Sequence, residues 1–265
     1  MDFAYRSDIG QQREENEDYV GVFKNKAGIN FAIVADGIGG HQGGDVASEM
    51  AVSHMGYRFE NTTFDQPTDA VKWLANEVQD ENQHIIEKAR EFSDLKGMGT
   101  TMVATLLFDG EFLMANLGDS RGYLFREGEL HQLTEDHSLV NELVKRGEIS
   151  AEQARKHPQK NIITRTLGIS PDADIDTNLF EMAAGDQLLL CSDGLTNMVP
   201  DDQLASVLKA TDQTAAQKCE TLIKMANAAG GLDNITALIV AVDGEVAGKW
   251  HPTIPLADDI ESFGH

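Results

Sequence analysis

The sequence predicts an α+β fold in which helices are grouped between runs of antiparallel strands. Short apolar segments rich in β-branched and aromatic residues recur along the chain, and each is bounded by Gly, Asp or Asn, as strands are. Two long segments instead carry apolar residues at helical spacing. Because the two kinds of segment do not alternate one for one, the order favours layers of strands and helices over a doubly wound parallel sheet.

The strongest strand signals come from short apolar runs. Strands are predicted at Phe31–Ala35, Thr101–Phe108, Phe112–Ala115, Gly122–Phe125, Gln187–Cys191 and Ile235–Val242. Long helices are predicted at Asp45–Phe59 and at Asp69–Phe92, which follows Pro67. Shorter helices are predicted at Leu139–Arg146, Ala151–Lys156, Asp202–Lys209 and Ala215–Ala229. Residues 136–167 interrupt the strand series, so we expect them to form an insertion over one face.

Composition narrows the function. The chain has 265 residues and a net charge of −23, and this negative field disfavours binding to nucleic acids or anionic membranes. No apolar run approaches the roughly 20 residues that span a bilayer, and the first residues lack a secretory signal. We therefore expect one soluble domain in the cytoplasm, followed by a loosely ordered tail over residues 247–265.

Cysteine chemistry is not expected. Only Cys191 and Cys219 occur, which is too few for a disulfide framework or a four-cysteine zinc site. A cysteine-dependent phosphatase would need Arg six residues after the nucleophile, and that position after Cys191 is Asn197. Cys191 lies in an apolar run, where a cysteine usually packs as a small core residue.

Four aspartates follow predicted strands or lie between them. They are Asp36 in Val-Ala-Asp-Gly, Asp119 in Leu-Gly-Asp-Ser, Asp193 in Cys-Ser-Asp-Gly and Asp233 in Gly-Leu-Asp-Asn. Each alone is an ordinary turn residue. As a group they could converge, and buried carboxylates without a counter-ion are costly. Oxygen ligands favour magnesium or manganese over zinc or copper, so the pattern indicates a site for such ions.

Two further segments carry possible binding groups. The Gly-rich run 37–44 permits a tight turn from which a main-chain carbonyl could reach a metal, but no Walker-type Lys-Ser/Thr follows it. The segment Arg13-Glu14-Glu15-Asn16-Glu17-Asp18 reads either as a solvated charged turn or as a functional group of side chains. If the segment is functional, the Arg13 guanidinium could bind phosphate with two hydrogen bonds, and the carboxylates could hold metal-bound water.

Six motifs, taken in order, resemble the protein phosphatase 2C (PPM) family of metal-dependent serine/threonine protein phosphatases. They are Arg13-x-x-Asn16-Glu17-Asp18, Asp36-Gly37-x-Gly39-Gly40, Gly99-Thr100-Thr101, Gly118-Asp119-Ser120-Arg121, Ser192-Asp193-Gly194-Leu195 and Asp233-Asn234-Ile235-Thr236. Each is weak alone, but together they cover roughly residues 3–242. The resemblance is closest to compact bacterial members. It implies a four-layer α-β-β-α sandwich of two antiparallel sheets flanked by helices, a catalytic domain over residues 1–246 and a flap at 136–167.

The resemblance also implies a metal site, residue by residue. Asp36 would bridge two metal ions, and Gly37 would offer its carbonyl to one of them. Asp193 and Asp233 would complete the other. Asp119, together with Asp193, would hold a third and more weakly bound ion. The implied cofactors are manganese or magnesium, with two ions bound tightly and a third more weakly.

Further residues would serve the substrate and the centre. By the same resemblance, Arg13 would bind the substrate phosphate, and Glu17 and Asp18 would contact metal-bound waters. Thr101 and Asn234 would support the centre.

The general acid is left open by one departure from the family pattern. Many eukaryotic members place a His directly after the Asp-Gly pair, and here that position is Ile38. His41 is the nearest candidate acid. A loop-packing role for His41 is an equal alternative, with metal-bound water protonating the leaving group.

The implied function is hydrolysis of phosphoserine and phosphothreonine in proteins by a hydroxide between the metal ions, opposing serine/threonine kinases. The partners would be phosphorylated proteins, with a monomer as the default state.

One alternative is a serine hydrolase, because Gly118-Asp119-Ser120-Arg121-Gly122 fits Gly-x-Ser-x-Gly. A nucleophile elbow leads into a helix, however, and the residues after Ser120 are strand-like. The other alternative is a regulatory metal-binding domain without turnover, which would be expected to lack some of the aspartates.

Overall fold

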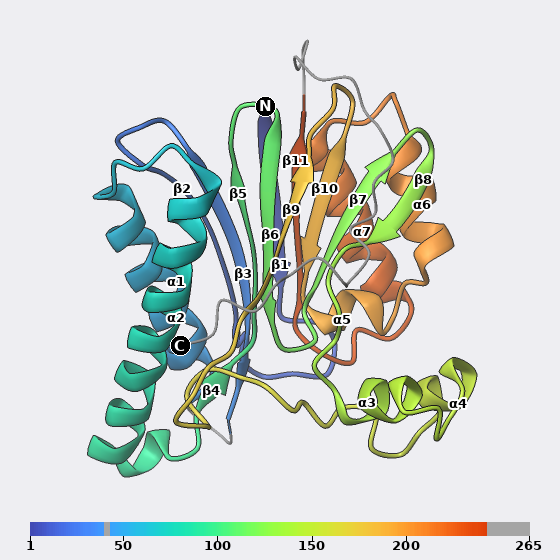
Figure 1. Ribbon diagram of the computed structural model, residues 1–265. Helices are drawn as coiled ribbons and strands as arrows, with labels where there is room; N and C mark the ends of the chain where they lie inside the picture. The colour runs from blue at the N-terminus through green and yellow to red at the C-terminus, as the bar shows by residue number, and fades with distance from the viewer. Residues whose placement is uncertain (40–42, 243–265) are drawn as a thin grey trace.

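The computed structural model describes residues 1–39 and 43–242, apart from the side chain of residue 155. Two antiparallel sheets pack face to face, and helices cover both outer faces (Figure 1). This arrangement confirms the α+β sandwich that the sequence predicted. The predicted tail at 247–265 lies outside the described residues, and the domain bounds 1–246 stay a prediction.

One sheet contains the last strand of the chain next to the first. Its strand order is β1-β11-β10-β7-β8, and every neighbouring pair is antiparallel. The bounds are Asp2–Asp8 for β1, Arg121–Arg126 for β7, Glu129–Gln132 for β8, Gln187–Cys191 for β10 and Ile235–Ala241 for β11. Because β1 pairs with β11 along its full length, the N-terminal segment is brought beside the loop that precedes β11.

The other sheet is six-stranded, with the order β2-β3-β5-β6-β9 and a short strand β4 paired to β3. The bounds are Asp18–Lys24 for β2, Asn30–Ile38 for β3, Gly99–Thr100 for β4, Met102–Leu107 for β5, Glu111–Leu117 for β6 and Asp176–Glu181 for β9. The central strands β3, β5 and β6 are almost entirely buried, which explains their continuous apolar sequences.

Helices form the two outer layers. Those beside the six-stranded sheet are α1 (Gly44–Glu60) and α2 (Pro67–Glu91), and the 3-10 turn η1 covers Ser93–Leu95. Those beside the other sheet are α5 (Asp193–Thr196), α6 (Asp201–Lys209) and α7 (Ala215–Ala228). All six predicted helices are present with small shifts at their ends, and α5 was not predicted. No helix within the described residues has the length and apolar character to cross a membrane.

Strand alternation divides the core into three layers. On β3, Phe31 and Ile33 pack against α1 and α2, whereas Val34 points to the opposite sheet. On β11, Ile239 packs beneath α6 and α7, and Leu238 faces the interface between the sheets. Successive side chains of a strand point to opposite faces. Strands buried on both faces therefore need apolar residues at nearly every position.

The predicted insertion between β8 and β9 contains two short helices, α3 (Leu139–Lys145) and α4 (Ala151–Arg155). They project from the end of the sandwich where α5 also lies (Figure 1). Each begins at a serine, Ser138 or Ser150, whose hydroxyl accepts a hydrogen bond from the backbone of the first helical turn. We call residues 136–167 the flap.

Candidate metal centre

The centre begins with two aspartates that face each other on neighbouring strands. Asp18 opens β2 and is paired directly with Asp36 on β3. Directly opposed residues of an antiparallel pair place their side chains on the same face. Asp18 is buried at 6% exposure, and Asp36 is partly exposed. Two carboxylates thus lie on one face of the six-stranded sheet, at the end where β2 begins.

Asp193 comes from the opposite sheet. It follows β10 as the first residue of α5, and its Oδ2 accepts a hydrogen bond from Asn197 Nδ2 at 2.9 Å. The preceding Ser192 donates from Oγ to Asp18 Oδ2 at 2.7 Å and accepts from the backbone N–H of Thr236 at 3.0 Å. This hydroxyl links Asp18 of the six-stranded sheet to β11 of the other sheet.

Asp119 occupies the turn between β6 and β7. The turn depends on Gly118, whose φ of +112° is a left-handed value that favours glycine. A Cβ at this position would also lie 2.6 Å from the side chain of Thr101. Asp119 is 9% exposed, and its Oδ1 is a buried acceptor without a hydrogen-bond partner.

Asp233 precedes β11 at the more open side of the centre. Its Oδ2 accepts from Arg13 Nη2 at 2.8 Å, with both side chains more than a third exposed. The neighbouring Asn234 donates from Nδ2 to the carbonyls of Ile9 and Glu15, each at 2.9 Å, and accepts from the N–H of Glu17 at 2.8 Å. Asn234 therefore holds the N-terminal loop against the centre, which explains how distant motifs meet.

Gly37 lies where three backbone segments meet. Its N–H donates to the carbonyl of Glu17 at 3.0 Å, and the same carbonyl accepts from Ser48 Oγ at 2.6 Å. A Cβ on Gly37 would lie 2.1 Å from the carbonyl oxygen of Gly44 and 2.6 Å from that of Glu17. Only glycine fits here, because both neighbours are backbone atoms.

Thr101 supports Asp36 through the main chain. Thr101 Oγ1 accepts from the N–H of Asp36 at 3.1 Å, and the Thr101 N–H donates to the Asp36 carbonyl at 2.9 Å. Thr101 Oγ1 also shares a 2.8 Å hydrogen bond with Ser120 Oγ. Ser120 is 1% exposed and precedes strand β7, not a helix, so it lacks the setting of a serine nucleophile.

Mutual repulsion and burial make this cluster unfavourable for negative charge. Burial raises the pKa of Asp18 to about 7, that of Asp119 to about 8 and that of Asp193 to about 6. Burial, together with the charges of Asp18 and Asp193, raises the pKa of Asp36 well above its ordinary value. Burial also raises the pKa of Glu17. A bound cation would reverse these effects by favouring the ionised carboxylates.

The donor chemistry fits divalent ions of the magnesium or manganese type. Among the described residues, Asp18 Oδ1 and Asp119 Oδ1 are buried carboxylate oxygens without hydrogen-bond partners. Such orphaned acceptors are costly unless a cation or water completes them. Within the described residues, no three His, Cys, Asp or Glu side chains are already arranged to hold a metal ion. The fit therefore rests on the unpartnered oxygens and the oxygen-only donor set.

The structure brings together most of the predicted residues. Those that meet at one end of the sheets are Arg13, Glu17, Asp18, Asp36, Gly37, Thr101, Asp119, Asp193, Asp233 and Asn234. The predicted acid His41 lies outside the described residues. Ser192 was missed as a functional residue, although it directly precedes Asp193 and is the only hydroxyl in its motif.

Two packed sheets with an acidic, oxygen-only centre at one end define the class of metal-dependent phosphatases built on a four-layer sandwich. The chain belongs to the protein phosphatase 2C family, whose family model matches residues 9–229. It is 47% identical over 250 residues to the serine/threonine phosphatase stp of Listeria monocytogenes, covering 94% of this chain and 99% of the relative. It is 43% identical to the protein phosphatase PhpP of Streptococcus pneumoniae, covering 93% and 100%.

Solved structures agree with this assignment. The serine/threonine phosphatase of S. agalactiae has a TM-score of 0.88 at 42% identity, covering 91% of this chain and 99% of that chain. The catalytic domain of the serine threonine protein phosphatase PstP, solved in complex with 2 manganese ions, has a TM-score of 0.80 at 34% identity, covering 92% and 98%. The fold and family predicted from the six motifs are thus confirmed.

Proposed function

We propose that this protein is a metal-dependent phosphatase that removes phosphate from phosphoserine and phosphothreonine in proteins. The observation that carries the proposal is the gathering of aspartates from both sheets around two unpartnered buried carboxylate oxygens, those of Asp18 and Asp119. The substrate class is supported by the relatives, which are named serine/threonine phosphatases.

The same carboxylates are the proposed metal ligands. Asp36 would bridge two ions, with the carbonyl of Gly37 on one ion and Asp193 and Asp233 on the other. Asp119 and Asp193 would share a third, weaker ion. Manganese is supported by the neighbouring PstP structure that holds 2 manganese ions. When bound, a pair of divalent ions would activate a water molecule for in-line attack and neutralise the phosphoryl oxygens.

Arg13 is the proposed phosphate-binding group. Its guanidinium pairs with Asp233, but this exposed ion pair is worth only about 0–1 kcal/mol. The guanidinium can therefore turn to a phosphate at little cost, and its fork geometry suits two phosphate oxygens. Asp18, held by Ser192, and Glu17, held through its backbone by Asn234, would orient water around the ions. His41 stays a candidate general acid.

Both alternative functions are less well supported by the site. A serine hydrolase would need an accessible Ser120, which is buried and bonded to Thr101. A regulatory domain without turnover would be expected to lack metal-site aspartates, and Asp36, Asp119, Asp193 and Asp233 are all present.

The cellular setting is a separate set of predictions. We infer that the substrates are phosphoproteins made by a serine/threonine kinase, and that the protein acts in the cytoplasm as a monomer. The net charge of −23 favours protein substrates over nucleic acids or anionic membranes.

The substrate class is tested by comparing matched peptides that carry phosphothreonine, phosphoserine or phosphotyrosine, with manganese present. We expect hydrolysis of the first two at a kcat/KM at least about 10-fold higher than for phosphotyrosine, a difference of about 1.4 kcal/mol in the barrier. Ser120→Ala should retain turnover. Equal activity on phosphotyrosine would contradict the substrate class, and loss of turnover in Ser120→Ala together with resistance to EDTA would favour the serine hydrolase.

A further inference from the structure

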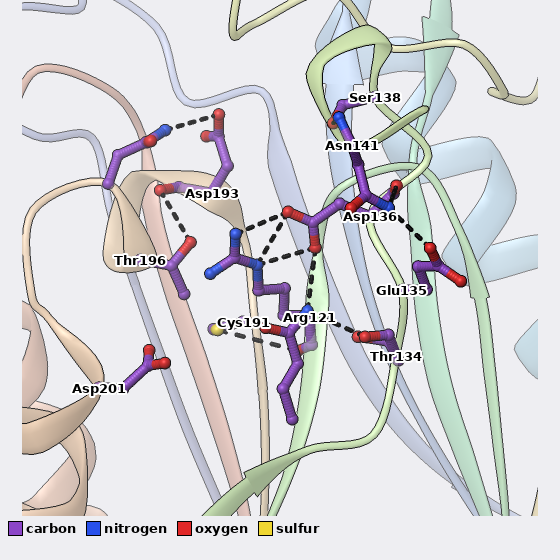
Figure 2. Close-up of polar contacts among 12 residues, drawn as sticks. Arg121, Thr134, Glu135, Asp136, Ser138, Asn141, Cys191, Asp193, Thr196 and Asp201 are labelled. Carbon is purple, nitrogen blue, oxygen red and sulfur yellow. Dashed lines mark hydrogen bonds and ion pairs between the residues drawn. The ribbon is translucent and has the colours of Figure 1, made fainter. Parts of the chain in front are cut away.

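The start of the flap and the two residues before it are held by hydrogen bonds to the β6–β7 hairpin. We call residues 134–138 the flap root. The N–H of Gly122 donates to Thr134 Oγ1 at 3.0 Å, and Asn116 Nδ2 donates to the carbonyl of Glu135 at 2.8 Å. Arg121 donates to the Asp136 carboxylate from Nε and Nη2, and the shortest distance, from Nη2 to Oδ2, is 2.6 Å. Figure 2 shows the guanidinium pointing toward this carboxylate. The flap therefore starts from a fixed base.

His137 makes the contacts in this root that reach the metal centre. Its side chain is 6% exposed. Its N–H donates to the carbonyl of Gly118 at 2.9 Å, and its ring Nδ1 accepts from the N–H of Gly118 at 3.1 Å. Both backbone polar groups of Gly118 are thus bonded to one residue. Gly118 directly precedes Asp119, so His137 fixes the turn that presents this carboxylate.

On its other side His137 contacts the returning end of the flap and the first residue of β9. Its carbonyl accepts from the N–H of Thr164 at 2.8 Å, and its ring Nε2 lies 3.0 Å from Asp176 Oδ2. Asp176 also accepts from Arg165 Nη1 at 3.1 Å. One buried residue consequently joins three segments: its ring contacts the turn that carries Asp119 and the first residue of β9, and its carbonyl contacts the returning end of the flap.

The hydrogen bonds define the tautomer of the ring. The N–H of Gly118 can only donate, so Nδ1 must offer a lone pair. Nε2 then carries the proton and donates it to Asp176, whose carboxylate holds the ring in this orientation. In metal sites, a histidine that binds the ion through one ring nitrogen is often oriented by a hydrogen-bond partner on the other nitrogen. Here Asp176 is the orienting partner on Nε2, and Nδ1 accepts from the backbone of Gly118, next to the proposed ligand Asp119.

We propose that His137 is a positioning residue that holds the Gly118–Asp119 turn in place for the ion shared by Asp119 and Asp193, and that links this turn to the flap. The inference rests on the third-ion site described under the proposed function. Movement of the flap's returning end would be transmitted through Thr164 to the main chain of His137, and movement at the start of β9 would be transmitted through Asp176 to the His137 ring and from there to Gly118.

Two substitutions remove the two ring contacts of His137 one at a time. His137→Asn places an amide oxygen near the position of Nδ1, so it keeps the acceptor for Gly118 and loses Asp176. His137→Gln reaches toward the position of Nε2, so it keeps the contact with Asp176 and loses the acceptor. Both remove the imidazole, so a merely structural role predicts similar damage from both. Asp119→Asn serves as the reference for loss of the third ion.

The readout is the number and affinity of manganese ions bound, measured by titration calorimetry on EDTA-treated protein, with circular dichroism to confirm folding. We expect His137→Gln to weaken the weakest ion by about 10-fold to 100-fold, as loss of a supporting partner does in other metal sites. His137→Asn should stay within about 3-fold of the natural protein. The tighter ions should be unaffected in both variants.

Contrary results would distinguish an error in the role of His137 from an error in the third-ion site. If Asp119→Asn loses the weakest ion but both His137 variants bind it normally, or lose it equally, then His137 does not position the turn and the third-ion site stands. If Asp119→Asn binds every ion that the natural protein binds, the third-ion site itself is wrong. As a metal-free test, nitrogen NMR of the His137 ring should report the Nε2–H tautomer; an Nδ1–H tautomer would overturn the proposal.

Discussion

Asp18 lies directly opposite Asp36 in the β2–β3 pairing, so two carboxylates share one face at the inner end of a sheet. Like charges in opposed positions destabilise a sheet. The pair opposes folding unless a ligand compensates for it, and divalent ions have the required charge. Metal-free stability and metal binding therefore oppose each other at this centre.

Asp18→Asn should stabilise the metal-free protein. The substitution removes one of the two opposed charges, and its amide oxygen can still accept from Ser192 Oγ. We expect the free energy of unfolding in EDTA at pH 8, above the pKa of about 7 for Asp18, to rise by about 1 kcal/mol, measured by urea denaturation. Asp80→Asn, on the exposed face of α2, is the charge-matched control and should change little. Equal or lower stability in Asp18→Asn would show that the charges are already compensated.

Stability without metal should decrease as the pH rises. The folded-state pKa values of Asp18, Asp119 and Asp193 are raised to about 7, 8 and 6, above the ordinary value near 3.9. The folded protein then holds protons that the unfolded chain has released. The stabilisation is complete below about pH 4 and is lost as the pH rises through these values.

Urea midpoints in EDTA at pH 6 and pH 8 measure this effect. We expect the lower midpoint at pH 8 and a smaller difference in Asp119→Asn. Manganese should raise the midpoint most at pH 8, because binding requires ionised carboxylates. A midpoint in EDTA that stays constant or increases from pH 6 to pH 8 would contradict the assigned shifts.

Gly37→Ala should disrupt the centre. The new methyl would lie 2.1 Å from the carbonyl oxygen of Gly44, a backbone atom that cannot move alone. We expect a loss of about 2–3 kcal/mol in the free energy of unfolding and weaker manganese binding. Gly128→Ala is the control: its φ is +90°, but no atom lies within 4 Å of the added methyl. The control carries backbone strain of about 1–2 kcal/mol without the clash, and should bind manganese normally.

Arg13→Ala should impair substrate binding more than folding. The guanidinium lies 47% exposed beside Asp233, so its removal costs little stability. We expect KM for a phosphothreonine peptide to increase about 10-fold, with a decrease in kcat, because a positioned phosphate-binding group is lost. Arg13→Lys should recover part of the affinity but not the two-pronged geometry. Arg90→Ala on α2 controls for loss of charge, and kinetics in Arg13→Ala equal to this control would refute the assignment.

The fold was predictable to the extent that each element is buried. The six predicted strands are the interior strands β3, β5, β6, β7, β10 and β11. Five strands were missed: β1, β2, β8 and β9 are the edges of the two sheets, and β4 is a two-residue strand paired to β3. An edge strand exposes much of its surface, so β1 and β9 carry polar residues at many positions and lack a continuous apolar run. Their assignment comes from pairing with a neighbour, which a local pattern does not contain.

The candidate site was predictable for a different reason. Asp36, Asp119 and Asp193 lie at the ends of strands, and strand ends can be located from sequence. The contacts that hold the site together join distant segments: Asn234 binds Ile9 and Glu15, and His137 binds Gly118 and Asp176. No local periodicity records such contacts, because they depend on which strands become neighbours.

We propose that Asp36 and its neighbouring carboxylates hold the metal ions required for dephosphorylation. The most direct test is hydrolysis of a phosphothreonine peptide by EDTA-treated protein as manganese is added, compared with Asp36→Asn. We expect no activity in EDTA and recovery with manganese in the natural protein. We also expect a loss of about 100-fold or more in kcat for Asp36→Asn at every metal concentration. Activity that survives EDTA, or natural turnover in Asp36→Asn, would rule out this metal site.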